Sequence, residues 1–104
     1  MIELRGKQKR WLRAQAHDMK PLFSIGKQGL SEEWLDQLGD ALEKRELFKV
    51  SILSNSDVEV AELKQAIEAN SELQVVQTIG HTLVLFGESS DRENRKYSAT
   101  VQKI

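Results

Sequence analysis

The apolar residues of this chain switch between helical and strand spacing several times, and this alternation constrains the fold more than any other feature. Between residues 30 and 42 they recur at helical intervals, as Leu30, Trp34, Leu35, Leu38 and Leu42. Residues 47–53 then alternate in polarity and are rich in strand-forming side chains. Such alternation is typical of a layered α/β domain, in which helices pack on a sheet.

Further start and stop signals divide the chain into an αβαβαββ series. We expect a helix over 7–18 with Gly6 as its N-cap. Pro21 prevents the helix from continuing, and we expect a strand over 22–25. Ser31 caps a second helix, and a capping box from Ser56 to Glu59 begins a third that ends near residue 70. Strands over 73–79 and 82–86 flank a tight turn. The sequence predicts a two-layer αβαβαββ domain with a four-stranded mixed sheet, containing a parallel crossover and a terminal hairpin.

Composition narrows the class of protein. The 104 residues suit one domain, which we place at residues 1–88, followed by a polar and mobile tail at 89–104. Cysteine is absent, which fits a reducing compartment, and no apolar run approaches the ~20 residues of a membrane span. We therefore expect a cytoplasmic protein without a membrane partner.

The small net charge of −1 conceals a strong segregation of charge. Residues 1–29 contain seven Lys and Arg residues and two acidic residues. Residues 30–87 contain four Lys and Arg residues and eleven acidic residues. On the first helix, one arc opposite Trp11 and Leu12 carries basic side chains, namely Lys9, Arg10, Arg13 and His17. A basic face of this kind favours a nucleic-acid partner, although runs of charge are often only solvated surfaces.

A G-x-x-G loop, Gly26-Lys27-Gln28-Gly29, lies between the first strand and the second helix. Glycines permit close approach of a phosphate backbone, and the following helix start offers free N–H groups and a positive dipole end. The loop matches neither the P-loop nor the dinucleotide-binding fingerprint. Taken alone it is equally compatible with a turn that binds nothing.

Catalytic and metal-binding patterns are weak. His17 and His81 fall in different elements, and neither has a second histidine at metal-ligand spacing. Ser24 and Lys27 match S-x-x-K, but the companion motifs of that enzyme class are absent, so the match is interpreted as chance. We expect no enzyme activity, no metal and no cofactor.

Several motifs in a fixed order carry a family resemblance. They are residues 7–13 (KQKRWLR), Ala16-His17, Lys20-Pro21, residues 25–31 (IGKQGLS), residues 46–50 (ELFKV) and residues 77–80 (QTIG), followed by residues 83–85. Together they resemble the CRM domain, the chloroplast RNA splicing and ribosome maturation domain of bacterial YhbY-like proteins. The resemblance covers about residues 4–87 and departs at His81 and at Phe86-Gly87, where the family often has a lysine and a Tyr-Arg pair.

The resemblance implies a fold like the C-terminal domain of translation initiation factor three and an RNA-binding role on precursors of the large ribosomal subunit. Its RNA-contacting loop corresponds here to Gly26, Lys27, Gln28 and Gly29. The adjoining basic surface corresponds to Lys7, Lys9, Arg10, Arg13, His17 and Lys20. Binding is expected to be directed at the RNA backbone by a monomer, without an exposed aromatic platform. A protein-interaction module that docks a basic ribosomal protein on the acidic second and third helices is the alternative.

Overall fold

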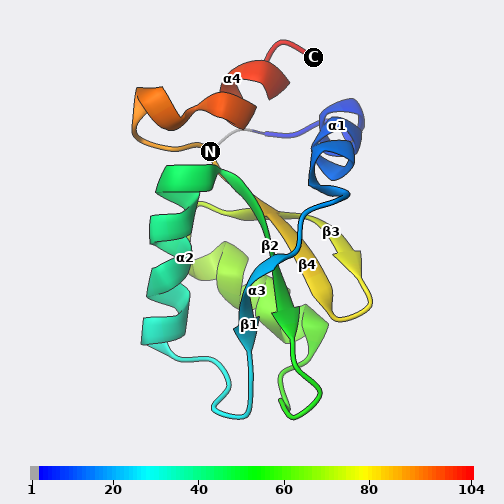
Figure 1. Cartoon of the computed structure of the whole chain (residues 1–104), viewed down its shortest axis with the longest axis vertical. Coiled ribbons are helices and arrows are strands. Elements are labelled where there is room, and N and C mark those ends of the chain that lie inside the picture. The colour runs from blue at the N-terminus through cyan, green and yellow to red at the C-terminus, as the bar shows by residue number, and fades with distance from the viewer. Residues whose placement is uncertain (1–2) are drawn as a thin grey trace.

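The computed structural model describes residues 3–104 and contains a four-stranded sheet with helices on both faces (Figure 1). Its elements, in chain order, are α1 (Gly6–Ala16), β1 (Pro21–Ile25), α2 (Glu32–Arg45), β2 (Leu47–Ile52), α3 (Val60–Asn70), β3 (Gln74–Ile79), β4 (Thr82–Phe86), the 3-10 helix η1 (Arg92–Asn94) and α4 (Lys96–Val101). The αβαβαββ series is therefore confirmed, with two further helical segments after it. No helix in the described part of the chain is long and apolar enough to cross a membrane.

The sheet is mixed, with the strand order β1-β2-β4-β3. β1 and β2 pair in parallel through the α2 crossover, whereas β4 pairs antiparallel with both β2 and β3. The predicted parallel crossover and terminal hairpin are both confirmed. Since β1 is an edge strand, the loop that follows it lies at a border of the sheet.

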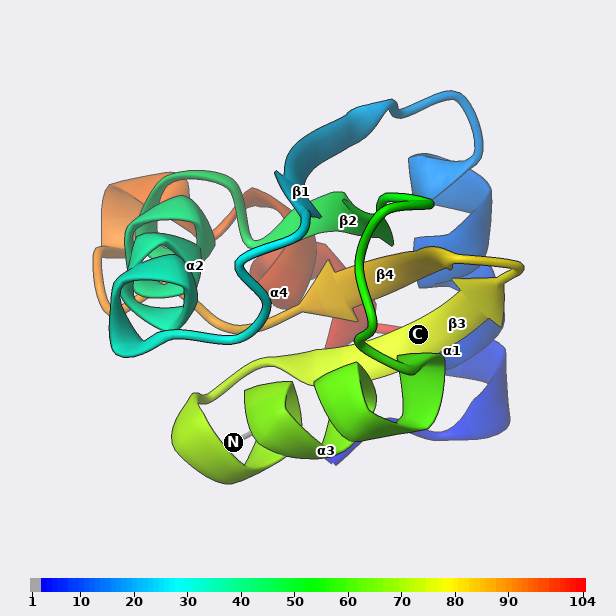
Figure 2. The ribbon, with the colours of Figure 1, turned by 90° about the horizontal axis from the view of Figure 1, so that it is seen from below.

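Two apolar cores lie on opposite faces of the sheet. The larger core joins α2 and α3 to one face through side chains such as Leu38, Leu63 and Val50. The smaller core joins α1 and α4 to the other face through side chains such as Leu12 and Val101. Figure 2 shows α2 and α3 on one side of the sheet and α1 on the other. The sequence predicted two layers, namely the sheet and the helices on one face. The structure adds a partial third layer, which α1 and α4 form on the other face.

α2 begins and ends where its sequence predicts. The Ser31 hydroxyl accepts a hydrogen bond from the backbone N–H of Trp34 at 3.1 Å, which satisfies one of the free donors of the first turn. Lys44 and Arg45 occupy the last turn, where the helix dipole favours cations. The helix stops at Glu46, whose φ of 61° is incompatible with a further helical turn.

The starts of α1 and α3 differ from the predicted ones. The N-cap of α1 is Arg5, not Gly6, and its N–H donates to Oε1 of Gln8 at 2.8 Å. The prediction that Ser56 caps α3 is wrong, because its hydroxyl accepts from the N–H of Val58, only two residues ahead, at 3.2 Å. This short local turn competes with capping, so the helix begins four residues after Ser56.

The C-terminal segment is folded onto the domain, which differs from the expected mobile tail. The buried carboxylate of Glu46 accepts hydrogen bonds from the backbone N–H groups of Ser89, Tyr97 and Ser98 at 2.8, 2.9 and 3.0 Å. It also accepts one from the Ser98 hydroxyl at 2.5 Å. Val101 is fully buried against α1 and the sheet, so this segment contributes both polar and apolar contacts.

Candidate nucleic-acid interface

The glycine loop is a tight turn at one end of the molecule. The N–H of Gly29 donates to the carbonyl of Gly26 at 3.0 Å, and this bond presents Lys27 and Gln28 as exposed residues at the tip. Gly29 has a φ of 70°, a conformation that side chains with a Cβ rarely adopt. A Cβ on Gly26, in contrast, would meet its neighbours at ordinary contact distances of 3.6 Å and more. The turn geometry therefore requires only the second glycine.

A hollow of about 270 Å³ lies behind this turn, and Trp34 lines it together with Ser31 and the loop residues. The indole N–H of Trp34 donates to the carbonyl of Ser24 at 2.9 Å, which holds the ring at the border of β1. Trp34 also packs against the larger core, as its helical spacing predicts. Its half-buried ring nevertheless leaves an aromatic surface beside the loop, where none was expected.

The start of α2 offers less to an anion than the sequence suggested. Glu32 and Glu33 occupy its first turn, and both are exposed. Their charges oppose an anion at the positive end of the helix dipole, and the Ser31 hydroxyl already occupies the N–H of Trp34. A phosphate at this end of the molecule would therefore lie toward the ammonium group of Lys27 and away from the helix axis.

The turn after β2 lies beside the glycine loop, and reasoning from the sequence missed it. The N–H of Leu53 donates to the carbonyl of Ile25 at 2.9 Å, and Leu53 is 46% exposed. The Asn55 amide oxygen lies about 3.7 Å from the position of a Cβ on Gly26. Parallel pairing of β1 and β2 is the cause, because the carboxyl ends of parallel strands meet at the same edge.

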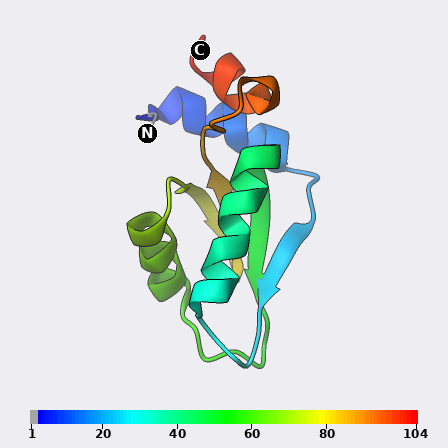
Figure 3. The same cartoon turned by 90° about the vertical axis from the view of Figure 1, so that its left-hand side faces the viewer.

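α1 lies at the opposite end of the molecule from the glycine loop, although it precedes β1 directly in sequence. Figure 1 and Figure 3 place α1 and the C-terminus together at one end of the long axis and the loop at the other. Lys7, Arg10 and His17 are exposed, Lys9 is half-buried, and Lys20 is exposed at the start of β1. The basic helix and the loop therefore do not form one compact patch, since β1 runs between them.

Two basic side chains of this region are held by backbone carbonyl groups. Nε of Arg13 donates to the carbonyl of Val76 at 2.9 Å, and Nζ of Lys49 donates to the carbonyl of His17 at 3.3 Å. Lys49 is only 8% exposed, and it is not among the residues predicted from the sequence. The alternation of side chains along β2 could have identified Lys49 from the sequence, because it places Lys49 on the same face as Leu47 and Ser51.

A polar strip connects α1 to the glycine loop across the sheet. A hollow of about 510 Å³ lies between α1 and this face, with Arg13, His17 and Lys49 among its lining residues. Further along the same face, the hydroxyls of Ser24 and Ser51 are hydrogen-bonded to each other at 2.9 Å. Ser24 is one residue from the buried end of β1, so the strip ends next to the loop. We call this surface, from His17 through Lys49 and Ser51 to Ser24, the polar strip.

The family positions that depart at the end of β4 are both buried in the fold. A Cβ on Gly87 would come 2.5 Å from Cδ1 of Leu42, so a larger residue would have to displace the Leu42 side chain. Phe86 is fully buried in the smaller core. These two residues contribute packing here, and their positions offer no side chain to a ligand.

Residues 3–104 contain no cluster of three or more His, Asp or Glu side chains that could bind a metal ion. His81 lies in the turn between β3 and β4, where its carbonyl accepts from the N–H of Ile52 at 2.8 Å. The arrangement of charges, hydroxyls and one aromatic ring is one that suits recognition of a phosphate backbone.

The chain is similar to proteins that are named as RNA-binding proteins. The family model of the CRS1 / YhbY (CRM) domain matches residues 4–86. The "Probable RNA-binding protein YqeI" of Bacillus subtilis is 44% identical over 90 residues, which cover 86% of this chain and 94% of that protein. An "RNA-binding protein" of Haemophilus influenzae is 38% identical over 92 residues, covering 88% and 92%. The solution structure of hypothetical protein SAV1595 from Staphylococcus aureus superposes with a TM-score of 0.71 at 41% identity, covering 86% and 94%.

Proposed function

Because this chain belongs to the CRS1 / YhbY (CRM) domain family, we propose that it binds ribosomal RNA in precursors of the large ribosomal subunit and acts in ribosome assembly. It acts as a monomer in the cytoplasm and catalyses no reaction on the RNA. Relatives named as RNA-binding proteins support the choice of ligand. The observation that carries the proposal is the exposed Lys27-Gln28 tip, which the left-handed Gly29 holds beside the open end of the polar strip.

Recognition in this proposal is directed mainly at the RNA backbone. Lys27 neutralises a phosphate, and the absence of side chains at Gly26 and Gly29 allows the backbone to approach the turn. The hydroxyls of Ser24 and Ser51 provide donors and acceptors for sugar and phosphate oxygens on the sheet. Trp34 offers one face on which an unpaired base can stack. Few groups read base edges, so sequence specificity is modest.

Charge segregation orients the protein on its ligand. Glu32, Asp36 and Asp40 are exposed at four-residue intervals along α2, and like charges repel an RNA backbone from that side. The basic residues of α1 and the loop lie at the two ends of the molecule, and the polar strip connects them. RNA therefore approaches along the side that carries the strip.

The salt dependence of binding tests this function. If about five phosphates are contacted, the logarithm of affinity should fall against the logarithm of salt concentration with a slope of roughly −3.5, at about 0.7 per phosphate of a single strand. Lys27→Ala should weaken binding and reduce that slope by about 0.7. Lys64→Ala is the matched control, because Lys64 is also an exposed lysine and lies on α3. An affinity for ribosomal RNA that does not depend on salt would refute the mechanism.

The acidic face of α2 supports a second candidate function, in which a basic ribosomal protein docks there. Glu32, Asp36 and Asp40 form no ion pair or hydrogen bond through their carboxylates within residues 3–104, so their charge is available to a partner. Gradient sedimentation of cell extracts with and without nuclease separates the two functions. Association with ribosomal particles that persists after RNA digestion would favour protein docking, whereas loss of association supports RNA binding.

A further inference from the structure

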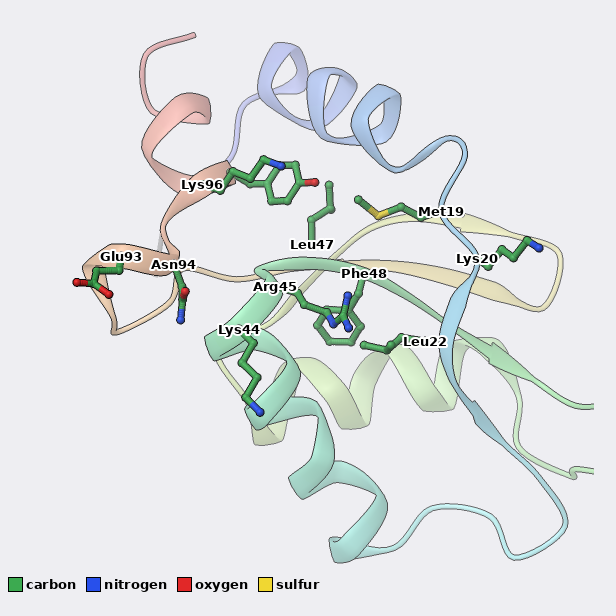
Figure 4. A pocket seen from close by; sticks show the side chains of 11 residues that line it. Met19, Lys20, Leu22, Lys44, Arg45, Leu47, Phe48, Glu93, Asn94 and Lys96 are labelled. Atoms are coloured by element: carbon green, nitrogen blue, oxygen red, sulfur yellow. The ribbon is translucent and has the colours of Figure 1, made fainter.

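A pocket of about 500 Å³ lies at the end of the sheet remote from the glycine loop (Figure 4). Its walls come from the α1–β1 connection, the last turn of α2 and the C-terminal segment. We call it the tail pocket, and its lining residues are Met19, Lys20, Leu22, Lys44, Arg45, Leu47, Phe48, Glu93, Asn94, Lys96 and Tyr97. Its volume lies within the range of about 300–1,000 Å³ that is typical of small-molecule sites.

The rim of the tail pocket carries a large excess of positive charge. Lys20, Lys44, Arg45 and Lys96 contribute four cations, and all four are exposed. Glu93 is the single acidic residue of the lining. None of the four cations is paired with a carboxylate within residues 3–104, although Nζ of Lys96 lies 5.5 Å from the centroid of the Tyr97 ring. Uncompensated cations around one hollow favour an anionic ligand.

The floor of the pocket is apolar, which a free inorganic anion does not require. Leu47 and Phe48 are almost fully buried beneath it, and Met19 and Leu22 are half-buried. Tyr97 is also half-buried, and its ring packs at a tilt against Trp11 with 6.3 Å between centroids. A cationic rim over apolar and aromatic side chains is complementary to a planar base linked to a phosphate. Asn94 adds an amide that can hydrogen-bond a base edge.

The wall formed by α4 is fixed in place, so the pocket exists before any ligand binds. Glu46 directly follows Arg45, and its carboxylate accepts from the N–H groups of Tyr97 and Ser98 at 2.9 and 3.0 Å. These bonds join the start of α4 to the end of α2, the two elements that carry most of the rim cations. A preformed site avoids the ordering cost that a flexible tail would add to binding.

We propose that the tail pocket binds a single unstacked nucleotide of the RNA that the glycine loop contacts, an inference that rests on the proposed function. Four of the lining residues, all within residues 93–97, lie beyond the family match, which ends at residue 86, so one wall of this site comes from the C-terminal segment of the present chain. β1 runs from the pocket at Lys20 to the glycine loop. Its five residues span roughly 17 Å, which is about five stacked nucleotide steps. One strand of RNA can therefore reach both sites along this edge.

Titration of the ¹⁵N-labelled full chain with adenosine monophosphate, followed by amide chemical shifts, tests the site directly. We expect saturable shifts at Asn94, Lys96 and Tyr97, and none at Lys27. Inorganic phosphate is the second probe, and it should bind more weakly by at least about tenfold because it cannot use the apolar floor. Equal affinity for the two probes would overturn the proposal in favour of a simple anion site.

Paired variants connect the pocket to RNA. Lys44→Ala with Arg45→Ala removes two rim cations, and the matched control removes two exposed lysines elsewhere, Lys64→Ala with Lys103→Ala. The rim variant should lose the nucleotide shifts and bind a single-stranded RNA of about twelve nucleotides at least roughly tenfold more weakly than the control variant does. Tyr97→Leu keeps most of the side-chain volume and should reduce nucleotide binding without removing charge.

The outcomes separate the pocket from the proposed function. If Lys27→Ala weakens RNA binding and the rim variant equals its control, the proposed function stands and the pocket inference is refuted. If the wild-type chain binds the mononucleotide in the pocket but has no affinity for RNA, the proposed function fails. Thermal melts of each variant ensure that a loss of binding is not a loss of fold.

Discussion

Glu46→Ala should detach the C-terminal segment from the domain. The Glu46 side chain is fully buried and accepts four hydrogen bonds, from three N–H groups and one hydroxyl in the segment 89–98. Alanine removes both carboxylate oxygens and leaves these donors without a partner. The segment must then either stay docked with unsatisfied donors or separate from α2 and expose Val101 to water.

The magnitude follows from the number and kind of bonds lost. Each buried donor left unsatisfied costs about 1–3 kcal/mol, but undocking limits the total. Removing one partner of a buried charged network typically costs about 3–5 kcal/mol, and we expect Glu46→Ala to fall in that range. Backbone conformation adds a second, separable contribution. Glu46 has a φ of 61°, so Glu46→Gly should be about 1 kcal/mol less destabilising than Glu46→Ala.

Urea denaturation gives the free energy of unfolding, and hydrogen exchange at the amides of Tyr97 and Ser98 reports local undocking. Glu72→Ala is the control, because Glu72 is exposed and its carboxylate makes no hydrogen bond or ion pair with residues 3–104, so its effect should stay within about 0.5 kcal/mol. If Glu46→Ala leaves the free energy of unfolding within that limit and both amides remain protected, the carboxylate does not anchor the segment. If the glycine and alanine variants are equally stable, the strain argument is wrong.

Three further outcomes are expected. Gly29→Ala should destabilise the fold by about 1 kcal/mol because of the positive φ, whereas Gly26→Ala should not, and urea denaturation of both variants checks the difference. Lys49→Met should keep thermal stability near that of the wild type, since methionine retains the buried stem, but should weaken RNA binding in a filter assay. Hydrogen bonds from the Ser90 hydroxyl and N–H hold the pKa of the Glu43 carboxyl below its usual range. The resulting stabilisation is present above about pH 4.3 and is lost as the pH falls through the lower pKa of the folded state, so the protection factor of the Ser90 amide against hydrogen exchange should fall there and not at neutral pH.

Local signals in the sequence predicted most of the central domain correctly. Ser31 caps α2 because its hydroxyl reaches an N–H three residues ahead. The apolar side chains that recur at helical spacing from Leu30 to Leu42 pack in the larger core, as predicted. Where two local bonding patterns compete, the sequence is ambiguous. Ser56 illustrates this, because S-x-x-E is compatible with both a capping box and the two-residue turn that the structure adopts.

The C-terminal segment could not be predicted in this way, because its contacts are distant in sequence. Ser98 and Glu46 are separated by 52 residues, and nothing in the local composition of either segment indicates the partner. In the sequence, Glu46 lies between a helix and an alternating strand, a position that is typical of a solvated glutamate. Burial of that carboxylate depends on donors that arrive only when α4 packs against α1 and the sheet.

In the candidate site too, distance along the sequence is a poor guide to distance in the structure. α1 and the glycine loop are separated by few residues, yet β1 between them is fully extended and places them at opposite ends of a molecule whose longest dimension is 40 Å. An RNA that contacts both ends must therefore extend for up to about twelve stacked nucleotide steps. The polar strip and the tail pocket both lie within that span, and each includes a residue of β1, Ser24 in the strip and Leu22 in the pocket. Affinity in this arrangement comes from several weak contacts distributed along one ligand, so the removal of any single lysine should reduce binding but not abolish it.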